Sequence, residues 1–158
     1  MRLALLFAAS GLAFAAHAGV TVTFVEPGKY TDVGRFSRST RSAEVMKDLE
    51  AHLLELGRTL PPGQDLAIEV LDIDLAGEER FPAGTGDVRI QTGRADWPSM
   101  TLRYTVARNG RAETREARIS DMGYQQRVRP VRPQETLPHE KRMLTDWFES
   151  LGLASRPR

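Results

Sequence analysis

The sequence contains no cysteine, which excludes disulfide bonds, thiolate metal sites and cysteine nucleophiles. It also lacks a Walker phosphate loop, a Gly-x-Ser-x-Gly nucleophile elbow and a His-Glu-x-x-His zinc motif. No long apolar run follows residue 16, so we expect no membrane-spanning helix after that point. What remains is 158 residues with 41% hydrophobic and 27% charged side chains. This is typical of one soluble globular domain, because domains hold about 100–200 residues.

The N-terminus has the three parts of a secretory signal peptide. Arg2 supplies the positive charge, residues 3–16 are almost uninterruptedly apolar, and Ala16-His17-Ala18 has the small-x-small pattern of a cleavage site. The apolar run is shorter than the ~20 residues that a bilayer-spanning helix needs. A lipid anchor would require a cysteine after the cleavage site. We therefore predict cleavage after Ala18, a periplasmic location without a membrane or lipid anchor, a single domain over residues 19–153, and a frayed tail over residues 154–158.

Charge is balanced in sum but not along the chain. Residues 44–87 carry eleven acids against three bases, whereas residues 88–133 carry ten arginines against four acids. The two segments either give the folded surface an acidic and a basic pole or neutralise one another within one sheet. Arg127, Arg129 and Arg132 could bind anionic envelope polymers. No aromatic residue lies between them, so we do not expect nucleic-acid binding.

Hydrophobic periodicity predicts a strand and then a helix in the first third of the chain. Residues 20–25 alternate with period two and are rich in β-branched residues. A helical face follows at spacings of three and four residues: Val45, Leu49, Leu53, Leu56 and Leu60. This helix begins at Ser39, Thr40 or Ser42 and ends at Gly57, before Pro61-Pro62.

The next strand changes phase part-way. Leu66, Ile68 and Val70 share one face, whereas Leu71, Ile73 and Leu75 share the other. Because a slip of one residue reverses every side chain, we expect a β-bulge near Val70-Leu71. The bulge would place Asp72 and Asp74 on the solvated face together with Glu69.

The second half of the chain contains the clearest local signal. Asn109-Gly110 between two alternating segments predicts a type I′ hairpin over residues 100–120. With Arg108 opposite Arg111, Met100 faces Ile119, Leu102 faces Ala117, Arg103 faces Glu116 and Thr105 faces Thr114. A short strand over residues 87–92, with Val88 and Ile90 inward, precedes the hairpin. A second helix follows it, with Thr136 or Leu137 as its cap, Pro138 in its first turn and Gly152 at its end.

The resulting order is β-α-β-β-β-β-α. The hairpin strands are polar on one face, which is expected when only the other face of a sheet is covered. We therefore predict an α+β two-layer sandwich, with a mostly antiparallel sheet of about five strands and two helices on one face.

Acidic residues after the bulge are the best catalytic or metal candidates. They are Asp72, Asp74, Glu78, Glu79 and Asp87. Paired carboxylates could hydrolyse a glycan, and three or more could bind Ca²⁺, although the fixed spacing of an EF-hand is missing. The simpler interpretation is a solvated strand edge, which the sequence favours. His52 and His139 lack partners at ligand spacing and are interpreted as structural. No cofactor is expected.

The segment Arg94-Ala95-Asp96-Trp97-Pro98 offers a candidate binding surface. A Trp-Pro pair before a strand often closes the end of a sheet. Alternatively, Trp97 is an exposed anchor for a sugar ring or a partner protein, flanked by Arg94, Asp96 and Arg103.

Four motifs occur in one order along the chain. They are Pro27-Gly28-Lys29-Tyr30-Thr31-Asp32, Asp72-Ile73-Asp74-Leu75-Ala76-Gly77-Glu78, Gly93-Arg94-Ala95-Asp96-Trp97-Pro98, and Glu140-Lys141-Arg142-Met143-Leu144 with Trp147-Phe148. Together they resemble the exported Gram-negative proteins catalogued as domain of unknown function 3016. The resemblance implies export and a single domain, and it assigns no activity and no functional residue.

The sequence thus favours an exported, non-enzymatic module that binds an envelope component or a partner protein. The alternatives are a secreted hydrolase that uses Asp72 and Asp74, with its substrate stacked on Trp97, and a calcium-binding module at the same acids. The oligomeric state is not predicted.

Overall fold

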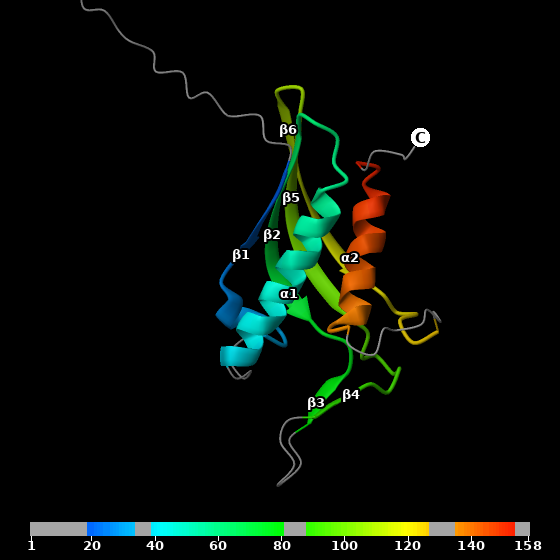
Figure 1. The fold of residues 1–158 in the computed structure, drawn as a ribbon. Coiled ribbons are helices and arrows are strands. Elements are labelled where there is room, and N and C mark those ends of the chain that lie inside the picture. The colour runs from blue at the N-terminus through cyan, green and yellow to red at the C-terminus, as the bar shows by residue number, and fades with distance from the viewer. Residues whose placement is uncertain (1–18, 34–38, 81–87, 127–134, 154–158) are drawn as a thin grey trace, which may run out of the picture.

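The computed structural model describes residues 19–33, 39–80, 88–126 and 135–153 (Figure 1). The predicted signal peptide, its cleavage site and the predicted tail lie outside these residues. The elements are β1 (Gly19–Phe24), a 3₁₀ helix η1 (Pro27–Lys29), α1 (Ser39–Gly57), β2 (Gln64–Asp74), β3 (Glu78–Arg80), β4 (Val88–Ile90), β5 (Ser99–Arg108), β6 (Arg111–Ser120) and α2 (Pro138–Ser150).

A four-stranded sheet with the order β1-β2-β5-β6 carries the fold. The strands β1 and β2 are parallel and are connected through α1, whereas β2–β5 and β5–β6 are antiparallel. The predicted α+β class is confirmed, and the predicted order of elements is right except for β3, a three-residue strand that was not expected. The predicted sheet of about five strands has four, because β4 pairs with β3 in a separate two-stranded ribbon. Ile90 was expected to face inward, but it is 41% exposed because the ribbon lies beyond the sheet.

The β5–β6 hairpin has the predicted register. Arg108 lies opposite Arg111, and the four further predicted pairs all occur. Asn109 and Gly110 both have positive φ, at 54° and 74°, as a type I′ turn requires. The register was predictable because a two-residue turn fixes the pairing of both strands.

A β-bulge interrupts the pairing of β2 with β5 between Val70 and Asp72, as predicted. The loop after β1 packs against this irregularity. The amide of Val25 and the hydroxyl of Tyr30 both donate to the carbonyl of Val70, at 2.9 and 2.6 Å. The amide of Asp32 donates to the carbonyl of Ile73 at 3.0 Å. The loop therefore covers the carboxyl end of β2, and Asp72 and Asp74 are half-buried rather than fully solvated.

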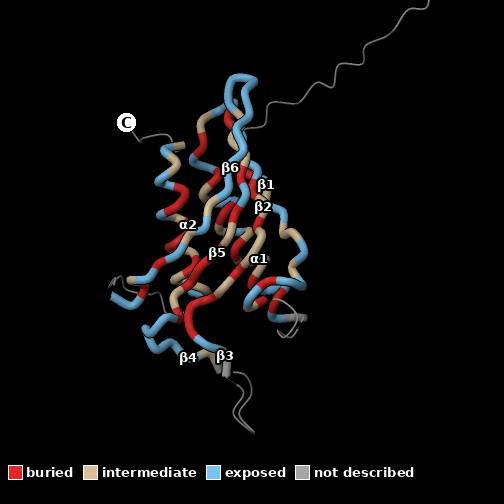
Figure 2. The backbone as a smooth tube through the Cα atoms, turned by 180° about the vertical axis from the view of Figure 1, so that it is seen from behind, coloured by how far each residue is buried: buried red, intermediate tan, exposed pale blue. Residues whose placement is uncertain are grey.

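Both helices lie on one face of the sheet, and the core fills the space between the two layers (Figure 1). The predicted leucine face of α1 and the apolar stripe of α2 are buried against the inner side chains of β2 and β5. Trp147 of α2 meets Tyr104 of β5 edge-on, with the ring centroids 5.4 Å apart. Seen from behind in Figure 2, exposed residues dominate β6 and the hairpin turn.

His52 holds the two helices together, as the structural interpretation predicted. Its Nε2 lies 2.8 Å from the carbonyl of Lys141 and 2.9 Å from the hydroxyl of Thr145, both on α2. Burial lowers the pKa of His52, so the neutral imidazole is favoured in this position. Among the described residues, no helix is long and apolar enough to cross a membrane.

Candidate functional site

Three aspartates lie around the carboxyl end of β2. Asp72 accepts hydrogen bonds from the amide and the hydroxyl of Thr31, at 2.7 and 2.9 Å. Asp32 accepts the amide of Leu75 at 2.7 Å and forms an ion pair with Arg89 at 2.8 Å. Asp74 lies beside Asp32. The bulge and the packed loop bring these carboxylates together, although Asp32 is distant in sequence.

Arg89 of β4 connects the segments at this end of the molecule. One guanidinium nitrogen, Nη2, contacts Asp32, and the other, Nη1, donates to the carbonyls of Leu75, Ala76 and Gly77. The arginine therefore ties the β3–β4 ribbon to the turn that follows β2. Since only 20% of its side chain is exposed, these contacts are partly shielded from water.

Asp74 has an unusual proton affinity. Burial, together with the charge and hydrogen bonding of Asp32 and the charge of Asp72, raises its pKa from 3.8 to about 6, against the opposing charge of Arg89. A carboxyl group whose pKa is raised by burial and neighbouring carboxyl groups is one arrangement that acid–base catalysis uses.

The acidic residues considered as candidate metal ligands do not come together in the described part of the chain. None of the groups of histidine, aspartate and glutamate there could hold a metal ion with three or more ligands. Asp72 and Asp74 belong to the cluster at the end of β2, whereas Glu78 is exposed on β3. The side chain of Glu79 and all of Asp87 lie outside the described part of the chain.

Asp96 organises the turn before β5. Its carboxylate is 7% exposed and accepts the amide of Thr92 at 2.5 Å, the hydroxyl of Thr92 at 3.0 Å, the amide of Gly93 at 3.2 Å and the hydroxyl of Tyr124 at 2.9 Å. Burial disfavours the charge, but these donors outweigh it and hold the pKa of Asp96 below its usual value. The carboxylate is therefore occupied within the fold.

The other members of the predicted binding surface are spread over two places. Arg94 is exposed and Trp97 is half-buried, and both belong to the same turn as Asp96. Arg103 lies on the face of β5 that the helices do not cover, where it pairs with Glu69 at 3.1 Å and Glu116 at 3.5 Å. Arg94, Asp96 and Trp97 are therefore close together because they are neighbours in sequence. Arg103 lies elsewhere and forms its own ion pairs.

A buried ion pair joins α2 to the segment after β6. Arg142 donates to Asp121 at 2.8 Å and to the carbonyl of Tyr124 at 2.9 Å, and Asp121 is 7% exposed. Two residues earlier on α2, Glu140 accepts a hydrogen bond from the amide of Ala76 at 2.8 Å. Tyr124 also packs edge-on against His139, with centroids 4.8 Å apart.

A groove lies at the opposite end of the molecule, between the hairpin and the C-terminal end of α2. Its volume is about 1150 Å³, and its lining includes Tyr104, Val106, Arg108, Arg111, Arg115 and Leu151. Tyr104 faces α2, and alternation along the strand places Arg108 on the same side as Tyr104. The groove therefore lies on the helix-facing side of the hairpin, at the C-terminal end of α2.

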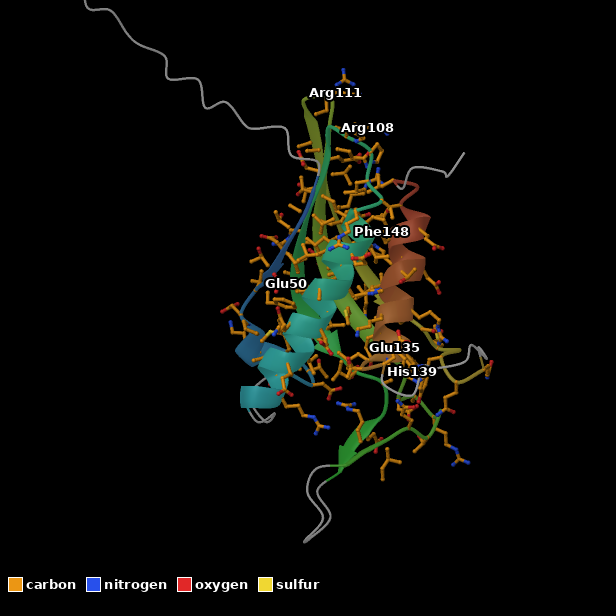
Figure 3. The ribbon with its side chains drawn as sticks, in the orientation of Figure 1. Glu50, Arg108, Arg111, Glu135, His139 and Phe148 are labelled. Carbon is orange, nitrogen blue, oxygen red and sulfur yellow. The ribbon has the colours of Figure 1, made fainter. Side chains whose placement is uncertain are left out.

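Two arginines in this groove have no counter-charge within the described residues. Arg115 is held by Glu113, whose Oε1 accepts its Nε and one terminal nitrogen at 2.9 and 2.7 Å. Arg108 and Arg111 are exposed and lie directly opposite each other, and their side chains make no hydrogen bond or ion pair to another described residue. Figure 3 shows both at the hairpin end, with His139 at the other end.

Comparison with known families gives one match. Residues 18–150 match the family described as "Protein of unknown function (DUF3016)". The chain belongs to this family. The family membership expected from the four sequence motifs is thereby confirmed. No curated protein and no solved structure matches the chain.

In this DUF3016 protein, the groove with Arg108 and Arg111 was not predicted, although the predicted hairpin register contained a signal for it. The predicted register placed two like charges, Arg108 and Arg111, directly opposite each other, which destabilises a sheet unless something compensates. The pair Arg142–Asp121 had no such signal, because its partners lie on separate elements.

Proposed function

We propose that the protein is a periplasmic, non-enzymatic binding module of the bacterial envelope, and that it binds an acidic partner in the groove between the hairpin and α2. The observation that carries this proposal is the pair of exposed arginines, Arg108 and Arg111, opposite each other and without counter-charge in the described residues.

The chemistry of the pair favours an anionic ligand. Like charges directly opposite in a sheet repel each other, and a bound anion removes this repulsion. A guanidinium group presents donors in a fork that matches a carboxylate. Tyr104, Val106 and Leu151 line the same groove beside the arginines.

Binding of an acidic polymer tests this function. Fluorescently labelled poly-L-glutamate should bind the wild-type protein at low ionic strength, and binding should weaken as salt is added. The double variant Arg108→Ser/Arg111→Ser should lose most of this affinity. Arg118→Ser is the matched control, because Arg118 is an exposed arginine of β6 outside the groove lining. Equal affinity in the double variant and the control would refute the proposed site.

The periplasmic location rests on the N-terminal sequence. The charged residue, apolar run and cleavage pattern support it, and the family match begins at residue 18, at the predicted cleavage point. Mass spectrometry of the protein from a periplasmic extract should find Gly19 as its first residue. Recovery from the cytoplasm with Met1 retained would contradict export.

Hydrolysis is a second candidate function, favoured by the raised pKa of Asp74. Asp74, with its raised pKa, lies among carboxylates as the acid of a glycan hydrolase does. Against this, Asp32 already binds Arg89 and the amide of Leu75. If the protein cleaves peptidoglycan or a soluble glycan, Asp74→Asn should abolish the turnover. An inactive wild-type protein would remove this candidate.

A further inference from the structure

We propose that the groove and the free edge of β6 together receive an extended acidic segment of a partner protein, which adds to the sheet as a fifth strand. This inference rests on the proposed function and specifies its ligand. It joins three observations: the edge position of β6, the arginines beside it, and the groove that continues from its inner face.

The first observation is that β6 forms one edge of the sheet. Among the described strands it pairs only with β5, and none of its ten residues is buried. Every second residue of an edge strand directs its amide and carbonyl away from the sheet, where they can pair with another chain. Such an edge gives main-chain affinity to an added strand.

The second observation is the charge at this edge. Arg111 and Arg115 lie on the groove side of β6, and Arg108 lies one strand further in. Because Glu113 already pairs with Arg115, the positive charge that remains on the groove side is that of Arg108 and Arg111. Neighbouring strands lie about 4.8 Å apart, so an added strand would lie about 5 Å from the backbone of Arg111 and about 10 Å from that of Arg108, which long arginine and glutamate side chains together can span.

The opposite edge of the sheet does not offer the same features. β1 has only six residues and no charged side chain. Its sequence, Gly-Val-Thr-Val-Thr-Phe, provides no electrostatic selection for a partner. The acidic ligand is therefore assigned to the edge that carries arginines.

The geometry also defines the ligand. Side chains of an extended chain alternate between the two faces of a sheet. Acidic residues at every second position would face the groove and meet Arg111 and Arg108. The residues between them would extend the face not covered by helices, where Thr105 and Thr114 pair with their hydroxyls 2.7 Å apart. An acidic segment with threonine or similar residues at alternate positions fits both faces.

Fluorescence anisotropy with designed peptides tests the inference. The probe is a labelled octapeptide of alternating glutamate and threonine, and a lysine–threonine octapeptide is its charge control. We expect the acidic probe to bind the wild-type protein at least about tenfold more tightly than the double variant Arg108→Ser/Arg111→Ser. Arg118→Ser should stay within about twofold of the wild type, since this arginine lies outside the groove lining.

The main-chain part needs its own readout. The same acidic octapeptide with N-methyl groups on its four central residues keeps its charge but cannot form a strand ladder. We expect it to bind about tenfold more weakly than the unmodified probe. Hydrogen exchange of the β6 amides should slow when the unmodified probe is bound and remain unchanged with the methylated one.

The outcomes separate the two proposals. If both peptides bind equally and the β6 amides exchange at an unchanged rate, strand addition is wrong and the acidic groove remains. If neither the peptide nor poly-L-glutamate binds, both proposals fail. Arginine-dependent binding to phosphatidylglycerol vesicles without peptide binding would assign the groove to a membrane surface and overturn the inference. Protection of β6 in a dimer of the free protein would do the same in favour of a second copy.

Discussion

The two ends of the sheet use charge in opposite ways. At the carboxyl end of β2, Asp32, Arg89 and Asp96 are at least partly buried, and each is bonded to the loops around it. At the hairpin end, Arg108 and Arg111 are exposed and lack counter-charge among the described residues. At the first end the charged groups bind the surrounding loops, whereas at the second end the two arginines are available to a ligand. From residue types alone, the acidic cluster would have been chosen as the functional site, because clustered carboxylates are common in catalytic and metal sites.

The largest effect should come from breaking the buried ion pair at the loop end. Arg142→Met leaves Asp121 with an unpaired, buried carboxylate and removes a donor from the carbonyl of Tyr124. Loss of one partner of a buried pair costs about 3–5 kcal/mol. Urea unfolding should show this loss in the free energy of unfolding, whereas the exposed control Arg118→Met should change it by less than about 0.5 kcal/mol. Similar midpoints for both variants would show that the pair does not hold α2.

A smaller loss is expected when the Arg89 contacts are removed. Arg89→Gln takes the counter-ion from Asp32 and the guanidinium donors from the carbonyls of Leu75, Ala76 and Gly77. We expect a loss of about 1–3 kcal/mol, because water can rehydrate part of this half-open site. Hydrogen exchange should speed up in the β3–β4 ribbon before it does so in β5. Uniform acceleration across the sheet would contradict a local role.

Asp74 should make stability depend on pH in a direction that ordinary carboxylates do not. Its folded pKa of about 6 lies above its usual 3.8, so between these values Asp74 is more protonated in the folded protein than in the unfolded chain. The contribution of Asp74 to the free energy of unfolding is therefore present below pH 4 and is lost as the pH rises to about 6.

The variant Asp74→Asn isolates this contribution. Relative to the wild type, it should become more stable as the pH rises from 4 to 6, and the difference should then stay constant. The histidines titrate in both proteins and cancel in the comparison. Urea unfolding at pH 4, 5, 6 and 7 measures it, and a difference independent of pH would rule out the raised pKa.

The smallest effect is expected at the hairpin. Arg108→Ser/Arg111→Ser removes two opposed like charges, so the free energy of unfolding should be unchanged or rise by up to about 1 kcal/mol. Thermal unfolding of the wild type and the variant at low salt, where repulsion is strongest, measures it. A clear destabilisation would mean that these arginines belong to the fold and would weaken the proposed binding role.

Sequence patterns predicted the parts of the fold in which neighbours along the chain decide the structure. The turn Asn109-Gly110 fixed the hairpin register, the phase change at Val70-Leu71 fixed the bulge, and Gly57 marked the end of α1. The same reasoning failed for Ile90, because alternation shows a strand but not the sheet that the strand joins.

Contacts between distant elements could not be predicted in the same way. The local sequences around Asp32 and Arg89 contain no sign that the two residues interact. They form an ion pair only because the loop after β1 packs beside the β3–β4 ribbon. The candidate site at Asp72 and Asp74 was recognised without Asp32, which adds to the effect of burial in raising the pKa of Asp74. The turn around Asp96 was noticed, but its closure by Tyr124 was not visible from spacing alone.

The parallel pairing of β1 with β2 has a consequence for how the chain acquires its structure. The hairpin joins adjacent segments and can form within microseconds, whereas Val20 meets Leu66 only after the whole of α1 has been made and closed into a crossover. If the chain is exported from its N-terminus, β1 emerges first and must wait for its partner. We expect this first strand to be the last one to join the sheet.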